Sequence, residues 1–173
     1  TETARMTTTE EQDLLALAKR VLPAASFGNF AAEVIIREGR GCHVWDVAGR
    51  EYIDYLLGSG PMYIGHNHPK VTEAVLAQVP KGTTFFTNNE HGIRLAAAIV
   101  DAMACVEQVR FVSSGSEADL YAMRLARAYR KRSKIVKFEG GYHGMSDWGL
   151  MSLAPKRLAN FPEAVPDSPG IPE

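Results

Sequence analysis

One stretch decides the fold: residues 109–118, with the sequence Val-Arg-Phe-Val-Ser-Ser-Gly-Ser-Glu-Ala. Its first half is β-branched and aromatic, as in a buried strand, and its second half has the small polar residues that begin helices. Helical spacing of apolar side chains continues through residues 116–132, and a second β-rich segment follows at residues 134–138. A strand, a helix and a strand in this order predict a βαβ unit with parallel strands, so we expect an α/β fold.

The N-terminal third has a different pattern. Residues 10–22 have helical periodicity and begin with the capping-box pair Thr9 and Gln12, and Pro23 ends the helix. Glycine-containing turns then separate three short β-rich segments, residues 34–37, 43–46 and 52–55. This pattern predicts an antiparallel meander. Residues 1–59 are therefore expected to form a small-domain part made of one helix and a meander.

Residues 60–173 are expected to form the first, incomplete part of a larger domain. Two more helices are predicted before the βαβ unit, at residues 69–78 and 90–104, because apolar side chains recur there at helical spacing. Residues 154–173 contain five prolines and little periodicity, so they are predicted to be extended loop. The expected architecture is a mainly parallel sheet with flanking helices, preceded by the helix and meander.

Composition and charge exclude several classes of protein. Hydrophobic residues make up 46% of the chain and charged residues 23%, which is the balance of a folded protein with a core. The formal net charge of −1 gives no basic field for nucleic acid, and no apolar run approaches the roughly 20 residues that span a bilayer. Only two cysteines, Cys42 and Cys105, occur, far apart, as in reduced proteins of the cytoplasm. We therefore expect a soluble cytoplasmic protein without nucleic-acid or membrane partners.

The segment Ser114–Ser116 is a candidate anion site. A strand that turns directly into a helix presents unpaired backbone N–H groups and two hydroxyls at the positive end of the helix dipole. Gly115 would let a ligand approach the backbone closely. Phosphate binding and a plain helix cap both explain this pattern, because all helix N-termini share these donors.

A second turn, residues 138–144, is expected beside the first one. The carboxyl ends of neighbouring parallel strands share one crevice, so the glycine-rich turn after residues 134–138 should face the same ligand as Ser114–Ser116. Tyr142 offers a flat face that can lie against an aromatic ring, and His143 is adjacent. The alternative is that both side chains are turn residues packed under a loop.

Other constellations point to no chemistry. His66 and His68 could be paired metal ligands, but their neighbours Asn67 and Pro69 already explain the segment as a helix start, so no metal site is expected. No two aspartates have a spacing that argues for glycoside hydrolysis.

Four blocks together carry a resemblance to a known family. They are residues 60–69, 111–118, 124–128 and 137–144, the last with the sequence Lys-Phe-Glu-Gly-Gly-Tyr-His-Gly. In this order and spacing they resemble the N-terminal part of the class III, fold-type I aminotransferases, which use pyridoxal 5′-phosphate. The nearest branch is that of the glutamate-1-semialdehyde 2,1-aminomutases. The resemblance covers about residues 34–148.

The resemblance implies roles for individual residues. The cofactor phosphate would be held by Ser114, Gly115 and Ser116, while Tyr142 would lie against the pyridine ring, with His143 close to it and Glu117 as a weaker contact. Ser59 and Gly60 would line the substrate pocket. Residues 83–89 would lie near the interface of a homodimer. Small-molecule amines and carbonyl compounds are the implied substrates.

The resemblance also implies a lysine that this chain does not supply. Family members hold the cofactor as a Schiff base to a lysine on a strand well beyond the Tyr-His-Gly turn, and none of the seven lysines here has that position. We therefore expect no catalytic residue on this chain, which would be part of an enzyme whose C-terminal half lies elsewhere, for example on another chain. The alternatives are an aminomutase-like isomerase and a non-catalytic phosphate-ligand-binding fragment.

The substrate is open at this point. The aminomutase branch has an arginine after its N-terminal segment, whereas residues 25–30 here contain none. An ω-amine or β-amino acid donor is therefore as plausible as a semialdehyde.

Overall fold

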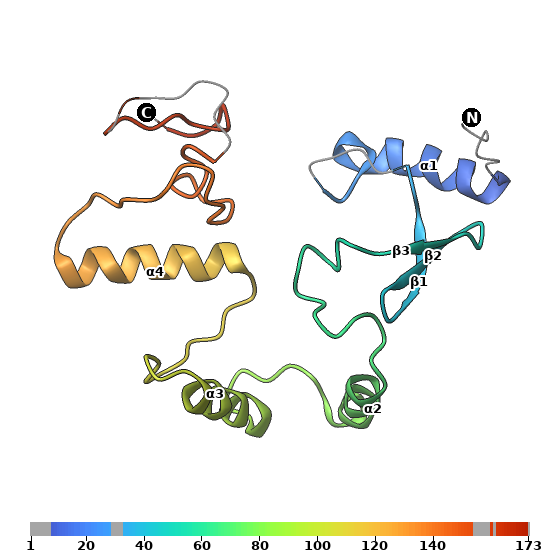
Figure 1. The fold of residues 1–173 in the computed structure, drawn as a ribbon, viewed down its shortest axis with the longest axis horizontal. Coiled ribbons are helices and arrows are strands. Elements are labelled where there is room, and N and C mark those ends of the chain that lie inside the picture. The colour runs from blue at the N-terminus through green and yellow to red at the C-terminus, as the bar shows by residue number, and fades with distance from the viewer. Residues whose placement is uncertain (1–7, 29–32, 154–159, 161, 173) are drawn as a thin grey trace. The chain divides into compact units, whose positions relative to one another are not determined.

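The structure is a computed structural model that describes residues 8–28, 33–153, 160 and 162–172 (Figure 1). The chain forms two compact units, residues 1–87 and residues 88–173. The predicted division at residue 60 concerns the domains of a complete enzyme, and it stays a prediction.

The first unit contains the predicted meander. Its three strands are β1 (Ile36–Arg40), β2 (His43–Asp46) and β3 (Glu51–Ile53), which pair antiparallel in the order β1-β2-β3. Val44, at the centre of β2, pairs with Gly39 on one side and Tyr52 on the other, and its side chain is buried. The meander is therefore confirmed, although β1 begins two residues later than the sequence predicted.

Helix α1 (Thr9–Val21) and the short 3₁₀ helix η1 (Pro23–Ala25) come before the meander, in that order. The predicted cap was wrong by one residue: Thr8, not Thr9, is the N-cap, and its Oγ1 accepts a hydrogen bond from the N–H of Glu11 at 3.2 Å. Thr8 and Glu11 also fit the capping-box pattern. The Glu11 carboxylate also binds the Arg50 guanidinium through both of its oxygens.

Helix α2 (Pro69–Gln78) begins after His68, with proline at the first helical position as predicted. The 3₁₀ helix η2 (Val79–Lys81) then ends at Gly82, whose φ is 94°.

The second unit contains the two longer helices, α3 (Glu90–Ala102) and α4 (Gly115–Arg130). Each begins at a polar cap: the side chain of Asn89 accepts from the N–H of Gly92, and that of Ser114 accepts from the N–H of Glu117. Helix α4 ends at Lys131, which has a left-handed conformation. Both predicted helices are confirmed to within two residues at either end.

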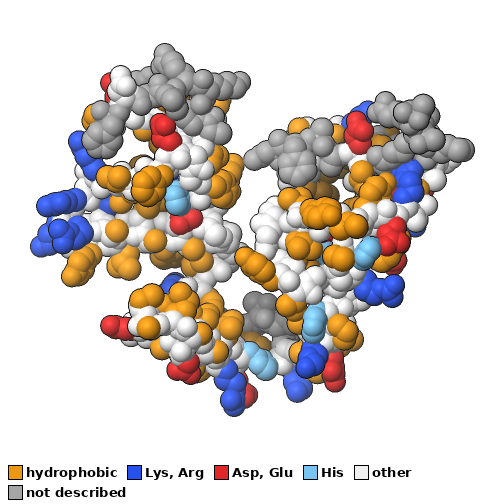
Figure 2. Space-filling model, in the orientation of Figure 1, with side chains coloured by type: hydrophobic (Ala, Val, Ile, Leu, Met, Phe, Trp, Pro, Cys, Tyr) orange, Lys and Arg blue, Asp and Glu red, His pale blue; other side chains and the backbone are white. Residues whose placement is uncertain are grey.

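The two predicted parallel strands were wrong. Residues 109–113 and 134–138 form no strand in the described chain, and the side chains of Val136 and Phe138 are exposed. A strand exists only when a neighbour completes its ladder, and no described segment pairs with either of these. Hydrophobic side chains on α3 and α4 are also exposed to solvent (Figure 2).

Several remaining expectations can be compared with the described residues. Cys42 and Cys105 are free thiols. None of the described helices is long and apolar enough to cross a membrane. In the C-terminal segment, residues 154–159, 161 and 173 lie outside the described residues, and Met151 forms an isolated antiparallel bridge with Pro166.

Candidate functional site

The start of α4 leaves two backbone donors available. The Oγ of Ser114 accepts from the N–H of Glu117 at 3.2 Å, and the Glu117 carboxylate accepts from the N–H of Ser113 at 2.8 Å. Within the described part of the chain, nothing accepts a hydrogen bond from the N–H of Gly115 or of Ser116. Two N–H groups therefore remain at the positive end of the helix dipole.

The glycine-rich turn lies directly against this helix start. Gly144 is buried with a φ of 79°, and a Cβ on it would be 2.4 Å from the Cα of Ser116. Only glycine fits this contact and this backbone conformation. The N–H of Met145 also donates to the Oγ of Ser116 at 3.1 Å. The structure thus brings the two predicted turns together, even though the strands expected to place them are absent from the described residues.

Hydrogen bonds to residues 149–152 also fix the glycine-rich turn. The N–H of Gly140 donates to the carbonyl of Ser152 at 3.0 Å. The Lys137 ammonium donates to the carbonyls of Gly149 and Met151 at 3.1 and 2.5 Å. These bonds tie the two ends of residues 137–152 together.

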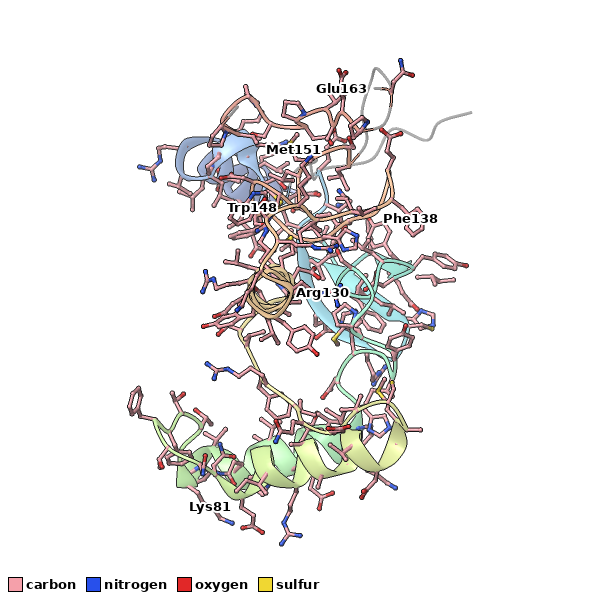
Figure 3. The ribbon with its side chains drawn as sticks, turned by 90° about the vertical axis from the view of Figure 1, so that its left-hand side faces the viewer. Lys81, Arg130, Phe138, Trp148, Met151 and Glu163 are labelled. Atoms are coloured by element: carbon pink, nitrogen blue, oxygen red, sulfur yellow. The ribbon has the colours of Figure 1, made fainter. Side chains whose placement is uncertain are left out.

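An arginine of α4 adds a further contact to this segment. The Arg127 guanidinium lies 4.3 Å from the centroid of the Trp148 ring, a cation–π contact, and its Nε donates to the carbonyl of Ser133 at 2.7 Å. Figure 3 shows Trp148 and Met151 on the segment that follows α4. The turn and the helix therefore form one local unit.

The two predicted ring-contacting residues lie on this turn. Tyr142 is 61% exposed, so one face of its ring is available to a planar ligand. His143 is half-buried, and its Nε2 would be 3.0 Å from a Cβ on Gly141, so the imidazole folds back over the glycines.

This set of groups fits a phosphate. Two free N–H groups and the Ser116 hydroxyl can donate hydrogen bonds to a phosphate, and the positive end of the helix dipole attracts its negative charge. A Cβ on Gly115 would meet no atom within 4 Å, so the backbone is open to a ligand there. The Glu117 carboxylate is turned back onto Ser113, where it shapes the loop.

The predicted substrate-side residues, Ser59 and Gly60, belong to the first unit. Both are exposed and lie on a turn in which four successive residues have positive φ: 46° at Leu57, 65° at Gly58, 64° at Ser59 and 107° at Gly60. Such runs are rare for non-glycine residues and are retained only where the surroundings enforce them.

Sequence reasoning missed a buried charged cluster in the first unit. The Arg50 guanidinium binds Asp46 Oδ2 at 2.7 Å and both Glu11 oxygens at 2.7 and 2.8 Å, and the Tyr52 hydroxyl donates to Asp46 at 2.9 Å. Glu11 and Asp46 are almost fully buried. The spacing of Asp46 and Arg50, four residues apart across a turn, could have indicated their ion pair. The ion pair of Arg50 with Glu11 joins residues 39 positions apart, and no local sequence pattern indicates it.

The charges of this cluster depend on one another. Burial alone would raise the pKa of Asp46, but hydrogen bonds from the Arg50 backbone and guanidinium, Tyr52 and Ala48 outweigh it and lower the pKa to about 2. Hydrogen bonds to Glu11 and Asp46 raise the pKa of the Arg50 guanidinium. The cluster joins α1 to the meander and is structural in character.

Sequence reasoning also missed the pair Asp54 and His66. Their side chains are 2.7 Å apart, between Asp54 Oδ2 and His66 Nε2. Within the described ranges, no three His, Cys, Asp or Glu side chains converge as a metal site, and His66 and His68 are not joined by further ligands.

Comparisons with known proteins show the family of the chain. The family model for class-III aminotransferases matches residues 25–172. A glutamate-1-semialdehyde 2,1-aminomutase from Sulfurihydrogenibium azorense is 49% identical over 140 residues, which are 81% of this chain and 32% of that protein. The chain therefore spans about a third of the length of that curated relative.

Solved structures show the fold. The structure matches an omega-transaminase from Sphaerobacter thermophilus with a TM-score of 0.86 at 35% identity, over 94% of this chain and 39% of that one. A transaminase with PLP bound matches with a TM-score of 0.80 at 37% identity, over 86% and 36% of the two chains. These matches confirm the predicted fold class. With a family model that covers most of its length and with these structural neighbours, the chain belongs to the class-III aminotransferases.

Proposed function

We propose that this chain carries the phosphate- and ring-binding part of a pyridoxal-phosphate site in an enzyme that moves an amino group between an amino donor and an aldehyde or keto acceptor. The observation that carries this proposal is the junction of Ser116 with Gly144 and Met145, which places an open helix N-terminus beside a turn with an exposed tyrosine. Family membership supplies the reaction class.

Each residue has a separate task in this proposal. The N–H groups of Gly115 and Ser116, with the hydroxyls of Ser114 and Ser116, bind the phosphate. Tyr142 lies against the pyridine ring and His143 stays close to it. Glu117 shapes the loop by binding the N–H of Ser113. When bound, pyridoxal phosphate supplies an aldehyde that takes up and releases amino groups.

In our proposal, the amine that activates the cofactor lies outside residues 1–173. Lys137 is the lysine nearest to the turn in sequence, and its ammonium is engaged by two backbone carbonyls. An ammonium held in this way is a structural donor and not a nucleophile. We therefore assign binding and positioning to this chain and no catalytic residue.

The substrate side of the proposal uses the first unit. Ser59 and Gly60 line the pocket for small-molecule amines and carbonyl compounds, and residues 83–89 lie at the interface of a cytoplasmic homodimer. Phe86 on this segment is fully exposed, as an interface residue would be in a separated chain. The C-terminal half of the enzyme is on the same or another chain.

A second candidate function is an aminomutase-like isomerase. The 49% identical relative with that name favours it. An isomerase moves the amino group within one molecule, whereas an aminotransferase moves it between two. Incubation of the full-length protein with an isotopically labelled amine and an unlabelled acceptor separates them, because only a transferase passes the label to the second compound.

The cofactor proposal is tested by two substitutions in the full-length protein. Ser116→Ala removes a hydroxyl that also fixes Met145, and Gly115→Val fills the open backbone, so we expect each to weaken cofactor binding by about tenfold. The visible absorbance of bound cofactor measures this. Ser133→Ala is the matched control, since Ser133 is used here through its backbone carbonyl. Unchanged affinity in both variants would reject the phosphate assignment.

A further inference from the structure

The turn at residues 57–60 needs an external restraint. Leu57 and Ser59 have left-handed φ values of 46° and 64°, a backbone conformation that is unfavourable for a non-glycine residue. The backbone bonds inside the turn, from Gly60 to the carbonyls of Leu56 and Leu57 and from Met62 to Leu57, are 3.1 to 3.2 Å long. A stable turn of this kind therefore depends on the groups that hold its entrance.

Asp54 holds that entrance. It follows the last residue of β3, and its backbone N–H donates to the carbonyl of Cys42 at 2.8 Å, so its position is set by the sheet. Its Oδ1 accepts from the N–H groups of Leu56 and Leu57 at 2.9 and 3.0 Å. The side chain therefore fixes the direction in which the chain leaves the sheet and enters the turn.

The side chain of His66 binds the Asp54 carboxylate. The second carboxylate oxygen, Oδ2, lies 2.7 Å from His66 Nε2. The hydrogen bond from His66 is the largest cause that lowers the pKa of Asp54, followed by that from the N–H of Leu57. Asp54 is thus a carboxylate with three hydrogen-bond donors at its two oxygens.

The place of His66 is itself built by the fold. Its backbone exchanges two hydrogen bonds of 2.8 Å with Gly41 at the β1–β2 connection. Its ring packs against Gly39, where a Cβ would be 2.7 Å from His66 Cγ. Any side chain at position 39 would displace the imidazole, so the glycine in β1 provides the space that the His66 ring occupies.

We propose that Asp54 and His66 are positioning residues that hold the turn bearing Ser59 and Gly60 in the geometry that receives the substrate. The inference rests on the proposed function, which places Ser59 and Gly60 at the substrate. This proposal gives the pair no role in cofactor binding. Loss of the pair is therefore expected to change substrate affinity and not cofactor affinity.

The test compares two substitutions at one position in the full-length holoenzyme. His66→Leu removes the donor, and we expect the KM of the amine substrate to rise about tenfold with little change in kcat or in cofactor affinity. His66→Gln carries an amide N–H that can reach Asp54 and should restore most of the loss. Asp54→Asn keeps the acceptor for Leu56 and Leu57 and provides a second variant if His66→Leu fails to fold. His68→Leu is the control, because His68 makes no side-chain bond at the α2 cap.

A second measurement does not depend on catalysis. Hydrogen exchange at the amides of Leu57 and Gly60 should speed up in His66→Leu and not in His66→Gln or His68→Leu. An unchanged KM, or an equal effect of Leu and Gln, would overturn the proposal. If the wild-type protein binds no cofactor and transfers no amino group, the proposed function fails, and the exchange rates alone then decide whether the pair holds the turn.

Discussion

Ser116 shows how one side chain can join two parts of a site. Its Oγ accepts from the N–H of Met145, and its Cα touches Gly144, so the phosphate loop and the tyrosine turn share one residue. The hydroxyl still has its own hydrogen to donate to a phosphate oxygen. Substitution at this position therefore alters both loops at once, which is why its effect on cofactor binding must be compared with that of Gly115.

The adjacency of these loops was predicted from the small residues at 114–116 and 140–144 and from an expected βαβ order, although the described residues form neither of its strands. The contacts of Arg50 with Glu11 and of Asp54 with His66 could not be predicted. Each joins side chains that are far apart in the sequence or lie on separate elements, and no periodicity records such a pairing.

The Asp46 cluster predicts acid sensitivity of the first unit. The pKa of Asp46 falls from 3.8 to about 2 in the folded state, so the unfolded chain binds more protons between these pH values. The stabilisation is complete above pH 3.8 and is lost as the pH falls toward 2. We expect urea midpoints, followed by Trp45 fluorescence in a Trp148→Phe background, to decrease over this interval.

The matching substitution is Asp46→Asn, which keeps an acceptor for the backbone and removes the charge opposite Arg50. This variant should be less stable than the wild-type protein at neutral pH and should lose less further stability in acid. The same acid dependence in both proteins would contradict the assignment to Asp46.

At the scale of elements, helices were more predictable than strands. Helices α2, α3 and α4 carry their own start signals, a proline or a polar cap, and these signals are local. The antiparallel strands of the meander also pair with near neighbours in sequence. Residues 109–113 and 134–138 have strand composition, but a parallel strand depends on a distant partner, and none of the described segments provides one.

The N-cap of α4 offers a way to separate helix stability from phosphate binding. Aspartate caps helices as well as serine does, so Ser114→Asp should retain the cap on Glu117. It also places a negative charge beside the two free N–H groups, and charge repulsion should weaken cofactor binding by about tenfold or more. Circular dichroism and cofactor absorbance measure the two effects separately.

The control for this charge is Thr8→Asp, the same kind of substitution at the N-cap of α1 in the first unit. It should leave cofactor affinity unchanged. Equal affinity of wild-type and Ser114→Asp proteins would show that no phosphate binds at the start of α4.

At the scale of the whole molecule, the chain leaves much apolar surface uncovered. Leu125 and Tyr129 on α4 are 72% and 82% exposed, and Val136 and Phe138 are 85% and 90% exposed. Phe138 points outward in Figure 3. Monomeric soluble proteins rarely expose contiguous apolar patches of this kind. The chain spans 32% of the aminomutase from S. azorense, so in a protein of that length other segments are available to cover these side chains.

This exposure predicts the behaviour of residues 1–173 as an isolated polypeptide. We expect it to enhance the fluorescence of an apolar dye and to associate as its concentration rises, because Leu125, Val136 and Phe138 have no cover within the described residues. Light scattering over a dilution series measures the association, and the full-length protein is the control. Replacing Val136 by Thr and Leu125 by Gln together should reduce both signals. A monomer that binds no dye would mean that these side chains find cover within the chain itself, and would contradict the expectation that segments outside residues 1–173 cover them.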